Sequence, residues 1–269
     1  MSLTLGIGPF SRREEAGQSN TVLAGPAHLL WFHDVPKRIR ATFAGEVIVD
    51  TERGRMLHET RLLPVYYLPR DDVRFDLLQP TATTTHCPFK GDARYWTIRV
   101  GDREATDAVW GYDAPIPGAP DLAPYVAFYF ERMDAWFEED VEIAGHPRDP
   151  FHRVDICPSS RRVTVRVDGE TVAQTDSPVL LFETGLPVRY YLPTDAWRAD
   201  VLEPSQLTTV CPYKGTADYR SLRSPATGEL LESLLWRYAD PLDESRAIAG
   251  LWCVDQHDDR IEVEVSPGR

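Results

Sequence analysis

The stretch Thr84-Thr85-His86-Cys87-Pro88-Phe89-Lys90-Gly91-Asp92-Ala93-Arg94-Tyr95 recurs 124 positions later as Thr208-Thr209-Val210-Cys211-Pro212-Tyr213-Lys214-Gly215-Thr216-Ala217-Asp218-Tyr219. An ungapped alignment of residues 39–95 with 163–219 gives identity at about 24 of the 57 positions. Solenoid repeats are much shorter than this period, so the repeat indicates two tandem homologous domains. We expect an N-terminal tail at 1–24, a first repeat domain at 25–145 and a second at 146–269.

Both copies show the period-two alternation of strands. Val163-Thr-Val-Arg-Val alternates apolar and polar residues and runs into the turn residues Asp168-Gly169, and residues 39–50 repeat this pattern around Gly45. Such a pattern predicts a β-hairpin, and further short apolar segments predict about seven short strands per copy. Few segments have helical periodicity. The sequence therefore predicts an all-β protein whose two domains are each a coiled antiparallel sheet or a small barrel, with few short helical turns.

Composition narrows the choice of partners and of compartment. The formal net charge is −13 and the sequence pI is about 5.0, which argues against nucleic-acid binding and against docking on an anionic membrane. No apolar run reaches the length of about 18 residues that a membrane helix needs. Residues 1–20 lack the features of a signal peptide, so we expect a cytoplasmic protein. The four cysteines form no C-x-x-C pair, so we expect no metal site.

Several repeated motifs together resemble one family. They are Tyr66-Tyr67-Leu68-Pro69, Cys87-Pro88-Phe89-Lys90-Gly91, Trp110-x-Tyr112 and Ala127-Phe128-Tyr129, with Glu59, Asp76 and Tyr95. The set resembles domain-of-unknown-function family 427, which is catalogued as nucleotidyltransferase-like, in two tandem copies. The resemblance implies a compact β-fold of the β-tent (Mss4-like) type. Zinc-binding cysteine pairs, which occur in many β-tent proteins, are absent from this sequence.

Two charged residues recur at fixed offsets beside apolar strands. Glu59 and Glu183 each border a strand, and a carboxylate in such a place must be paired or have a raised pKa. Their best repeated partners are Lys90 and Lys214, or Arg74 and Arg198. The pattern suits a structural ion pair, and it also suits a general base or a ligand-binding group.

The Cys-Pro-aromatic-Lys-Gly turn admits a chemical and a structural interpretation. A lysine three residues after Cys87 or Cys211 would lower the pKa of that thiol, and a Lys-Gly pair would suit an anion. In the structural interpretation the cysteine is a small buried hydrophobe and the glycine supplies a positive φ in a hairpin turn. His86 and Cys87 are neighbours on a strand and point to opposite faces, so we expect no Cys-His pair.

Repeated aromatic residues are either core or the walls of a slot for a flat or cationic ligand. Together with the residues above, they complete our set of candidate ligand-binding residues, which is the following: Glu59, Tyr67, Cys87, Lys90, Trp110, Tyr112, Glu183, Tyr191, Cys211, Lys214, Trp236 and Tyr238.

Three functions remain open at this point. The first is a small-molecule-binding protein, with or without enzymatic activity, that has a pocket in one or both β-domains. The second is a Mg²⁺-dependent nucleotidyltransferase-like enzyme, which would need closely placed carboxylates such as Asp71 with Asp76. The third is a non-catalytic structural or interaction module. The sequence identifies no catalytic residue, no cofactor and no oligomeric state.

Overall fold

The computed structural model describes residues 28–268, which form two compact units that divide between Phe151 and His152. The predicted tail at 1–24 lies outside the described residues. The division lies a few residues beyond the expected boundary at 145.

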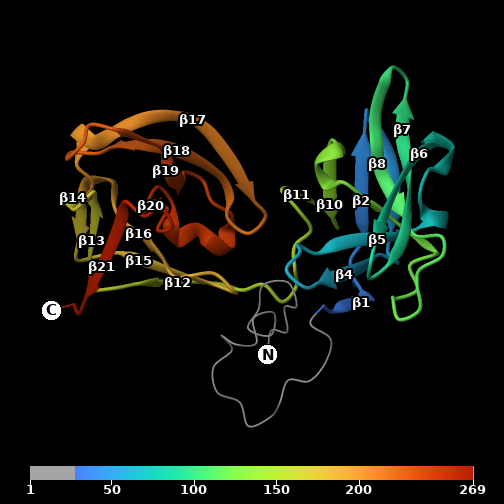
Figure 1. The fold of residues 1–269 in the computed structure, drawn as a ribbon, viewed down its shortest axis with the longest axis horizontal. Coiled ribbons are helices and arrows are strands. Elements are labelled where there is room, and N and C mark those ends of the chain that lie inside the picture. Colours follow the sequence, from blue (N-terminus) through green and yellow to red (C-terminus); the bar gives the residue numbers. More distant parts are fainter. Residues whose placement is uncertain (1–27, 269) are drawn as a thin grey trace, which may run out of the picture. The chain divides into compact units, whose positions relative to one another are not determined.

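The first unit consists of eleven described strands. They are β1 (Leu30–Asp34), β2 (Ile39–Phe43), β3 (Glu46–Thr51), β4 (Arg55–Glu59), β5 (Val65–Pro69), β6 (Leu78–Cys87), β7 (Gly91–Val100), β8 (Arg103–Gly111), β9 (Tyr125–Phe128), β10 (Ala135–Glu138) and β11 (Val141–Ile143). A seven-stranded sheet has the order β1-β4-β5-β9-β8-β7-β6, and a four-stranded sheet has the order β11-β10-β2-β3. The strand pairs are antiparallel, and β6, β7 and β8 lie side by side as long ribbons (Figure 1).

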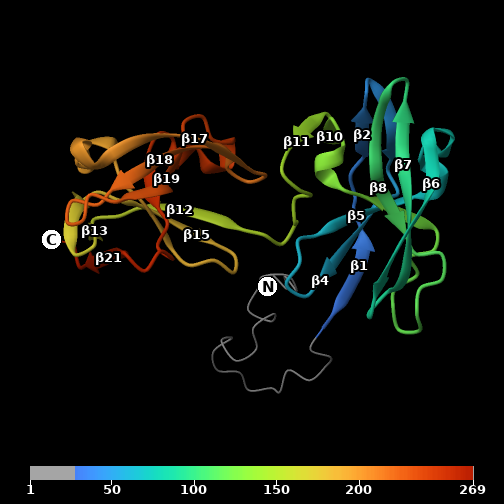
Figure 2. The ribbon, with the colours of Figure 1, turned by 45° about the horizontal axis from the view of Figure 1, so that its top comes forward.

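The second unit consists of ten described strands. They are β12 (Val154–Pro158), β13 (Arg162–Val167), β14 (Glu170–Thr175), β15 (Val179–Glu183), β16 (Arg189–Tyr191), β17 (Leu202–Cys211), β18 (Gly215–Arg223), β19 (Leu230–Tyr238), β20 (Trp252–Val254) and β21 (Ile261–Ser266). They form three sheets, ordered β12-β15-β16, β14-β13-β21 and β17-β18-β19-β20. Figure 2 shows β17, β18 and β19 together on one side of this unit. The backbone of Leu192 exchanges two hydrogen bonds with Trp252, which link the first and third sheets as the β5–β9 pairing does in the first unit.

The repeat is visible in the backbone. The hairpin turns at Ala44-Gly45 and Asp168-Gly169 have positive φ at both residues, which suits the twist of a two-residue β-hairpin. Register shifts recur between Pro80 and Thr84 and between Pro204 and Thr208. The predicted all-β class and the tandem arrangement are confirmed. The sheets are open, so the small-barrel alternative is wrong, and each unit has more strands than the seven expected.

Within residues 28–268, helical structure is limited to short 3₁₀ turns. They are η3 (Arg70–Asp72), η4 (Phe75–Leu77), η5 (Phe130–Arg132), η6 (Thr194–Ala196), η7 (Ala199–Val201) and η8 (Asp243–Ile248). Turns η3 and η6 directly follow the prolines that end Tyr-Tyr-Leu-Pro, because proline cannot donate to a sheet ladder but suits a helix start. None of the described helices is long and apolar enough to cross a membrane.

The described residues of each unit form two apolar clusters. In the first unit the larger cluster includes Ile39, Leu68 and Ile98, and the smaller one includes Tyr67 and Tyr112. In the second unit the larger cluster includes Leu192 and Trp252, and the smaller one includes Tyr191. The smaller cluster of each unit contains the repeated tyrosines, so the candidate residues lie beside a core and not on a flat surface.

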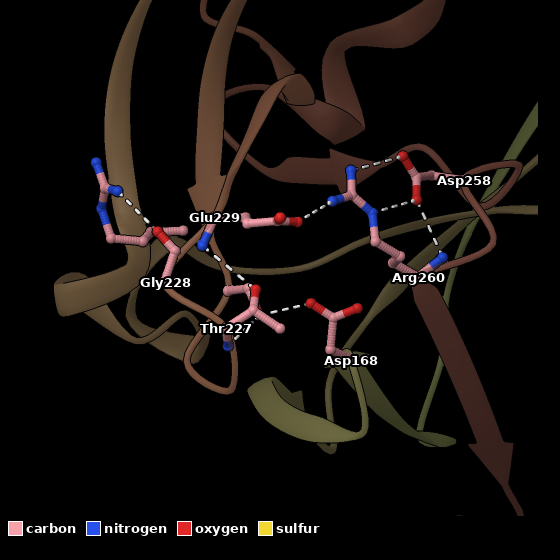
Figure 3. A network of polar contacts seen from close by, with 8 residues as sticks. Asp168, Thr227, Gly228, Glu229, Asp258 and Arg260 are labelled. Atoms are coloured by element: carbon pink, nitrogen blue, oxygen red, sulfur yellow. Dashed lines mark hydrogen bonds and ion pairs between the residues drawn. The ribbon is translucent and has the colours of Figure 1, made fainter.

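A polar network in the second unit holds three connections together (Figure 3). Arg260 contacts Asp258 and Glu229, and the buried Ser224 donates to Asp168 at 2.5 Å. These contacts tie the turn between β18 and β19 to the hairpin turn at Asp168 and to the loop between β20 and β21. That loop begins with Asp255, which matters for the site described below.

Candidate functional site

A buried cluster of three charged or polar side chains lies in the second unit. Glu183 ends β15, Lys214 lies in the turn between β17 and β18, and His152 precedes β12. The Lys214 Nζ atom is 2.6 Å from both carboxylate oxygens of Glu183, and His152 Nε2 donates to Glu183 Oε1 at 2.9 Å. The three side chains are between 4% and 9% exposed. A single carboxylate therefore receives two partners out of contact with bulk water.

The same cluster occurs in the first unit. His28 Nε2 donates to Glu59 Oε1 at 2.9 Å, and Lys90 Nζ donates to Glu59 Oε2. In both units the histidine lies 31 positions before the glutamate, which lies 31 positions before the lysine. Each histidine stacks on the aromatic residue next to the lysine, His28 on Phe89 and His152 on Tyr213, with ring centroids 3.7 and 4.2 Å apart. Of the two partner sets that the sequence left open, the structure has the lysines: Glu59 contacts Lys90, and Glu183 contacts Lys214.

The protonation of Glu183 follows from these contacts. Burial by itself raises the pKa of this carboxyl, because a charge in a low-dielectric site is poorly solvated. The hydrogen bond from His152 and the ammonium group of Lys214 more than offset burial, so the pKa of Glu183 lies below its ordinary value. Glu183 is therefore an anion at neutral pH, and Lys214 is its counter-ion.

The glycine turn positions the lysine. The N–H groups of Lys90 and Lys214 donate to the carbonyl oxygens of Cys87 and Cys211 at 3.2 and 3.3 Å, which closes a tight turn. The next residues, Gly91 and Gly215, have φ angles of +105° and +97°. Residues other than glycine rarely adopt this backbone conformation. The structural interpretation of the glycine as a source of positive φ is confirmed.

A pocket of about 380 Å³ opens beside the cluster in the second unit. Its wall is formed by the following residues: Leu181, Glu183, Leu186, Arg189, Tyr191, Cys211, Lys214, Tyr219, Ser233, Trp236, Tyr238 and Asp255. All six candidates from the second repeat belong to this set. Trp236 Nε1 donates to the hydroxyl oxygen of Tyr191 at 3.3 Å, and burial raises the pKa of both Tyr191 and Tyr238. The two phenols are therefore neutral at physiological pH.

The six candidates from the first repeat also gather in one place. Tyr67 and Tyr112 are buried in one apolar cluster, against which Cys87 and Trp110 pack. The Lys90 Nζ atom lies 5.9 Å from the centre of the Tyr112 ring. Glu59 and Lys90 are 7% and 8% exposed. The cluster is about as buried as its counterpart, because the side chains of Lys90 and Glu59 are 10% and 9% exposed and those of Lys214 and Glu183 are 9% and 6% exposed.

Trp110 also contributes to a separate apolar pocket of about 270 Å³ in the first unit. Its wall is formed by the following residues: Leu63, Pro64, Val65, Tyr66, Trp110, Phe128, Tyr129, Phe130, Glu131, Trp136, Gly145, His146 and Pro147. The equivalent tryptophan of the second unit, Trp236, faces the charged pocket instead.

The cysteines give little support to thiol chemistry. The ammonium groups of Lys90 and Lys214 contact carboxylates, which weakens any field that they exert on Cys87 or Cys211. The half-buried thiols of Cys87 and Cys211 pack against apolar clusters. Burial raises the pKa of Cys253 to about 12. His86 is exposed, and its Nδ1 atom lies 2.6 Å from Asp92 Oδ1, so its ring takes part in a surface contact.

The aspartates of the metal hypothesis lie on the surface. Asp76 and Asp200 belong to 3₁₀ turns and not to strands, and each forms two contacts with the arginine two residues before it, at 2.8 and 2.7 Å for Arg74 and at 3.2 and 2.6 Å for Arg198. Within residues 28–268, no group of three or more His, Cys, Asp or Glu side chains is arranged to hold a metal ion.

Among the polar residues of the site, sequence reasoning missed His28, His152, Arg189, Ser233 and Asp255. His28 and His152 are related by the repeat offset, so extending the alignment upstream of residue 39 would have found them. Arg189 and Asp255 carry no such signal. Val65 is the residue of the first repeat that is equivalent to Arg189. The pairing of β8 with β9 has the same register as that of β19 with β20, which makes Tyr129 the equivalent of Asp255. A search for repeated residues passes over them.

Comparison with known proteins gives a family. The sequence profile described as "Domain of unknown function (DUF427)" matches residues 31–139 and 155–266, so that one matched region lies in each unit. The short name of this family abbreviates NTP transferase. No curated protein matches the chain.

Proposed function

The chain belongs to the DUF427 family, and we propose that its second unit binds a small molecule in the pocket beside Lys214, Glu183 and His152. The observation that carries the proposal is that the six residues selected from the second repeat converge on one open pocket of about 380 Å³. This volume lies within the usual range of about 300–1,000 Å³ for ligand sites.

The composition of the pocket wall suits a ligand with a flat apolar part and a polar part. Tyr219, Trp236 and Leu186 supply apolar surface, whereas Arg189, Ser233 and Asp255 supply groups that form directional hydrogen bonds. Ligand sites generally combine a mainly apolar wall with a few well-placed polar groups. The wall of this pocket has that combination.

The buried cluster acts as a fixed floor in this proposal. Lys214 and Glu183 neutralise one another, and His152 is held between the carboxylate and the ring of Tyr213. A lysine whose ammonium group contacts a carboxylate is a poor nucleophile. The arrangement therefore supports recognition of a ligand more than covalent chemistry.

Screening tests the proposal. We expect ligand-observed NMR and thermal-shift measurements on the full chain to find cell metabolites that bind and raise Tm. The variant Trp236→Ala removes one wall of the pocket and should abolish this binding. The matched control is Trp110→Ala, which removes the equivalent indole from the first unit and should leave the binding intact.

Two results would overturn the proposal. If no metabolite binds the wild-type chain, or if a bound metabolite keeps its affinity in a folded Trp236→Ala variant, the pocket in the second unit is not the ligand site.

A further inference from the structure

We infer that the pocket of the second unit selects small organic anions, with the guanidinium group of Arg189 as the anchor for a carboxylate or phosphate group. The inference rests on the proposed function, because it names the ligand class of the same pocket. It goes beyond that proposal in assigning the recognition to Arg189, a residue that the repeat motifs do not contain.

The guanidinium group of Arg189 is incompletely hydrogen-bonded. Its side chain is 17% exposed and lines the pocket, and its Nη1 atom is buried without a hydrogen-bond partner among the described residues. The nearest acidic atom, Asp255 Oδ1, lies 3.7 Å away, which is too far for a hydrogen bond. A buried charged donor without an acceptor is unfavourable, so the site favours an incoming acceptor.

The other charged groups of the pocket wall already have partners. Both carboxylate oxygens of Glu183 contact Lys214, so this lysine has a close counter-ion. Asp255 Oδ1 accepts the N–H of His257 at 3.1 Å, in a loop that the contacts of Arg260 with Asp258 and Glu229 hold in place (Figure 3). Asp255 is thus fixed at a distance from Arg189. The guanidinium group of Arg189 is therefore a cation of this pocket that has an N–H donor without an acceptor among residues 28–268.

The guanidinium group of Arg189 is held in a defined orientation. The Cζ atom of Arg189 lies 5.3 Å from the centre of the Trp236 ring, so a cation–π contact holds the guanidinium group against one wall. Its planar fork of donors matches a carboxylate or a phosphate, which accept two parallel hydrogen bonds. The adjacent Trp236 and Tyr219 rings would contact the flat body of the same ligand.

The first unit lacks the charged pair of Arg189 and Asp255. Val65 and Tyr129 replace Arg189 and Asp255 there, and both line the apolar pocket of about 270 Å³. The fold is therefore built without this charged pair in the first unit. Because the fold does not require Arg189, the charge in the second unit is available for selecting a ligand.

Three ring compounds of similar size test the inference. We expect calorimetric titration of the full chain at low salt to detect benzoate or phenyl phosphate at least tenfold more tightly than benzyl alcohol. The carboxylate and the phosphate ester then identify which anion the pocket prefers. Added salt should weaken the binding of the anions, because it screens the guanidinium charge.

Variants assign the effect to Arg189. Both Arg189→Gln and Arg189→Val, the latter copying the first unit, should reduce anion affinity at least tenfold, whereas the surface control Arg198→Gln should not change it. Asp255→Asn should increase anion affinity, because it removes a competing carboxylate while an amide oxygen still accepts the His257 N–H. A purely structural Arg189–Asp255 pair predicts no such increase.

The outcomes separate this inference from the proposed function. If benzyl alcohol binds as tightly as the anions and Trp236→Ala abolishes that binding, the pocket binds ligands but the anion inference is wrong. If neither anion binds, or if folded Arg189→Gln and Arg189→Val bind anions as the wild type does, the inference is also wrong. The metabolite screen decides independently whether the pocket binds any ligand.

Discussion

At the scale of single residues, the buried Lys-Glu contact is the feature most open to test. Lys214 and Glu183 are 9% and 6% exposed at the side chain, and Lys90 and Glu59 repeat the contact in the first unit. Removing one partner of a buried pair leaves the other charge without compensation, which typically costs about 3–5 kcal/mol.

We therefore expect Lys214→Met to lower the free energy of unfolding of the second unit by about 3 kcal/mol, measured by denaturant unfolding. The loss should include a raised pKa of Glu183, because its ammonium partner is gone. The double variant Lys214→Met/Glu183→Leu should recover much of this stability. Equal destabilisation in the single and double variants would show that packing, and not the charge, is responsible.

A second residue-scale feature belongs to the first unit only. His58 is 2% exposed, its Nε2 atom is 3.0 Å from His33 Nε2, and its Nδ1 atom is 3.8 Å from Asp149 Oδ2. The rings of Trp31 and Phe151 surround this pair of histidines. Burial lowers the pKa of His58, Asp149 opposes that change, and His33 adds to it.

This lowered pKa predicts a dependence of stability on pH. The unfolded chain binds a proton at His58 near its ordinary pKa of 6.5, whereas the folded unit resists it, so the contribution of His58 to stability is complete above 6.5 and is lost as the pH falls below it. Hydrogen exchange should show the first unit losing protection as the pH falls from about 7 to about 5. Phe182 is the residue of the second repeat that is equivalent to His58, so His58→Phe introduces a side chain that the fold accepts at this position. This variant should lose less protection at low pH.

The control for that measurement is His86→Gln, which removes an exposed histidine of the same unit. An equal change in the two variants would contradict a special role for the buried ring of His58.

At the scale of elements, the turn after each Cys-Pro-aromatic-Lys segment depends on glycine. A Cβ atom at Gly91 would lie 3.3 Å from both Ala114 O and Ile116 Cγ2, whereas at Gly215 the nearest atom would be 3.6 Å away. At Gly118 the φ is +92° and nothing lies within 4 Å. The three glycines therefore separate the cost of positive φ from the cost of crowding.

We expect Gly118→Ala to destabilise the first unit by about 1 kcal/mol, through backbone strain alone. Gly91→Ala should cost more, about 2–3 kcal/mol, because crowding adds to the strain. Thermal unfolding of both variants checks this order. A Gly91→Ala variant as stable as Gly118→Ala would mean that the neighbouring loop yields without cost.

At the scale of the whole molecule, each unit has its own buried clusters and its own sheets. A unit with a separate core can fold by itself. We expect fragments 1–151 and 152–269 to fold when produced separately, with dispersed NMR spectra and cooperative unfolding. A fragment that stays unfolded would show that its core depends on the other unit.

The sequence by itself determined the tandem all-β organisation, the hairpin turns with their glycines and the need of Glu59 and Glu183 for a cationic partner, with the two lysines as one of two candidate sets. These features follow from local rules and from the repeat, since alternation marks strands, positive φ requires glycine, and a charge near the core needs a partner. Their signals lie within short windows or recur at one offset.

Only the tertiary structure decided which residues complete the site. His152 joins Glu183 because β12 pairs with β15, and Arg189 reaches the wall with Asp255 because Leu192 and Trp252 join two sheets. The structure likewise placed Asp76 in a surface turn. Such convergence depends on long-range pairing, and a residue present in one copy alone leaves no repeat by which to recognise it.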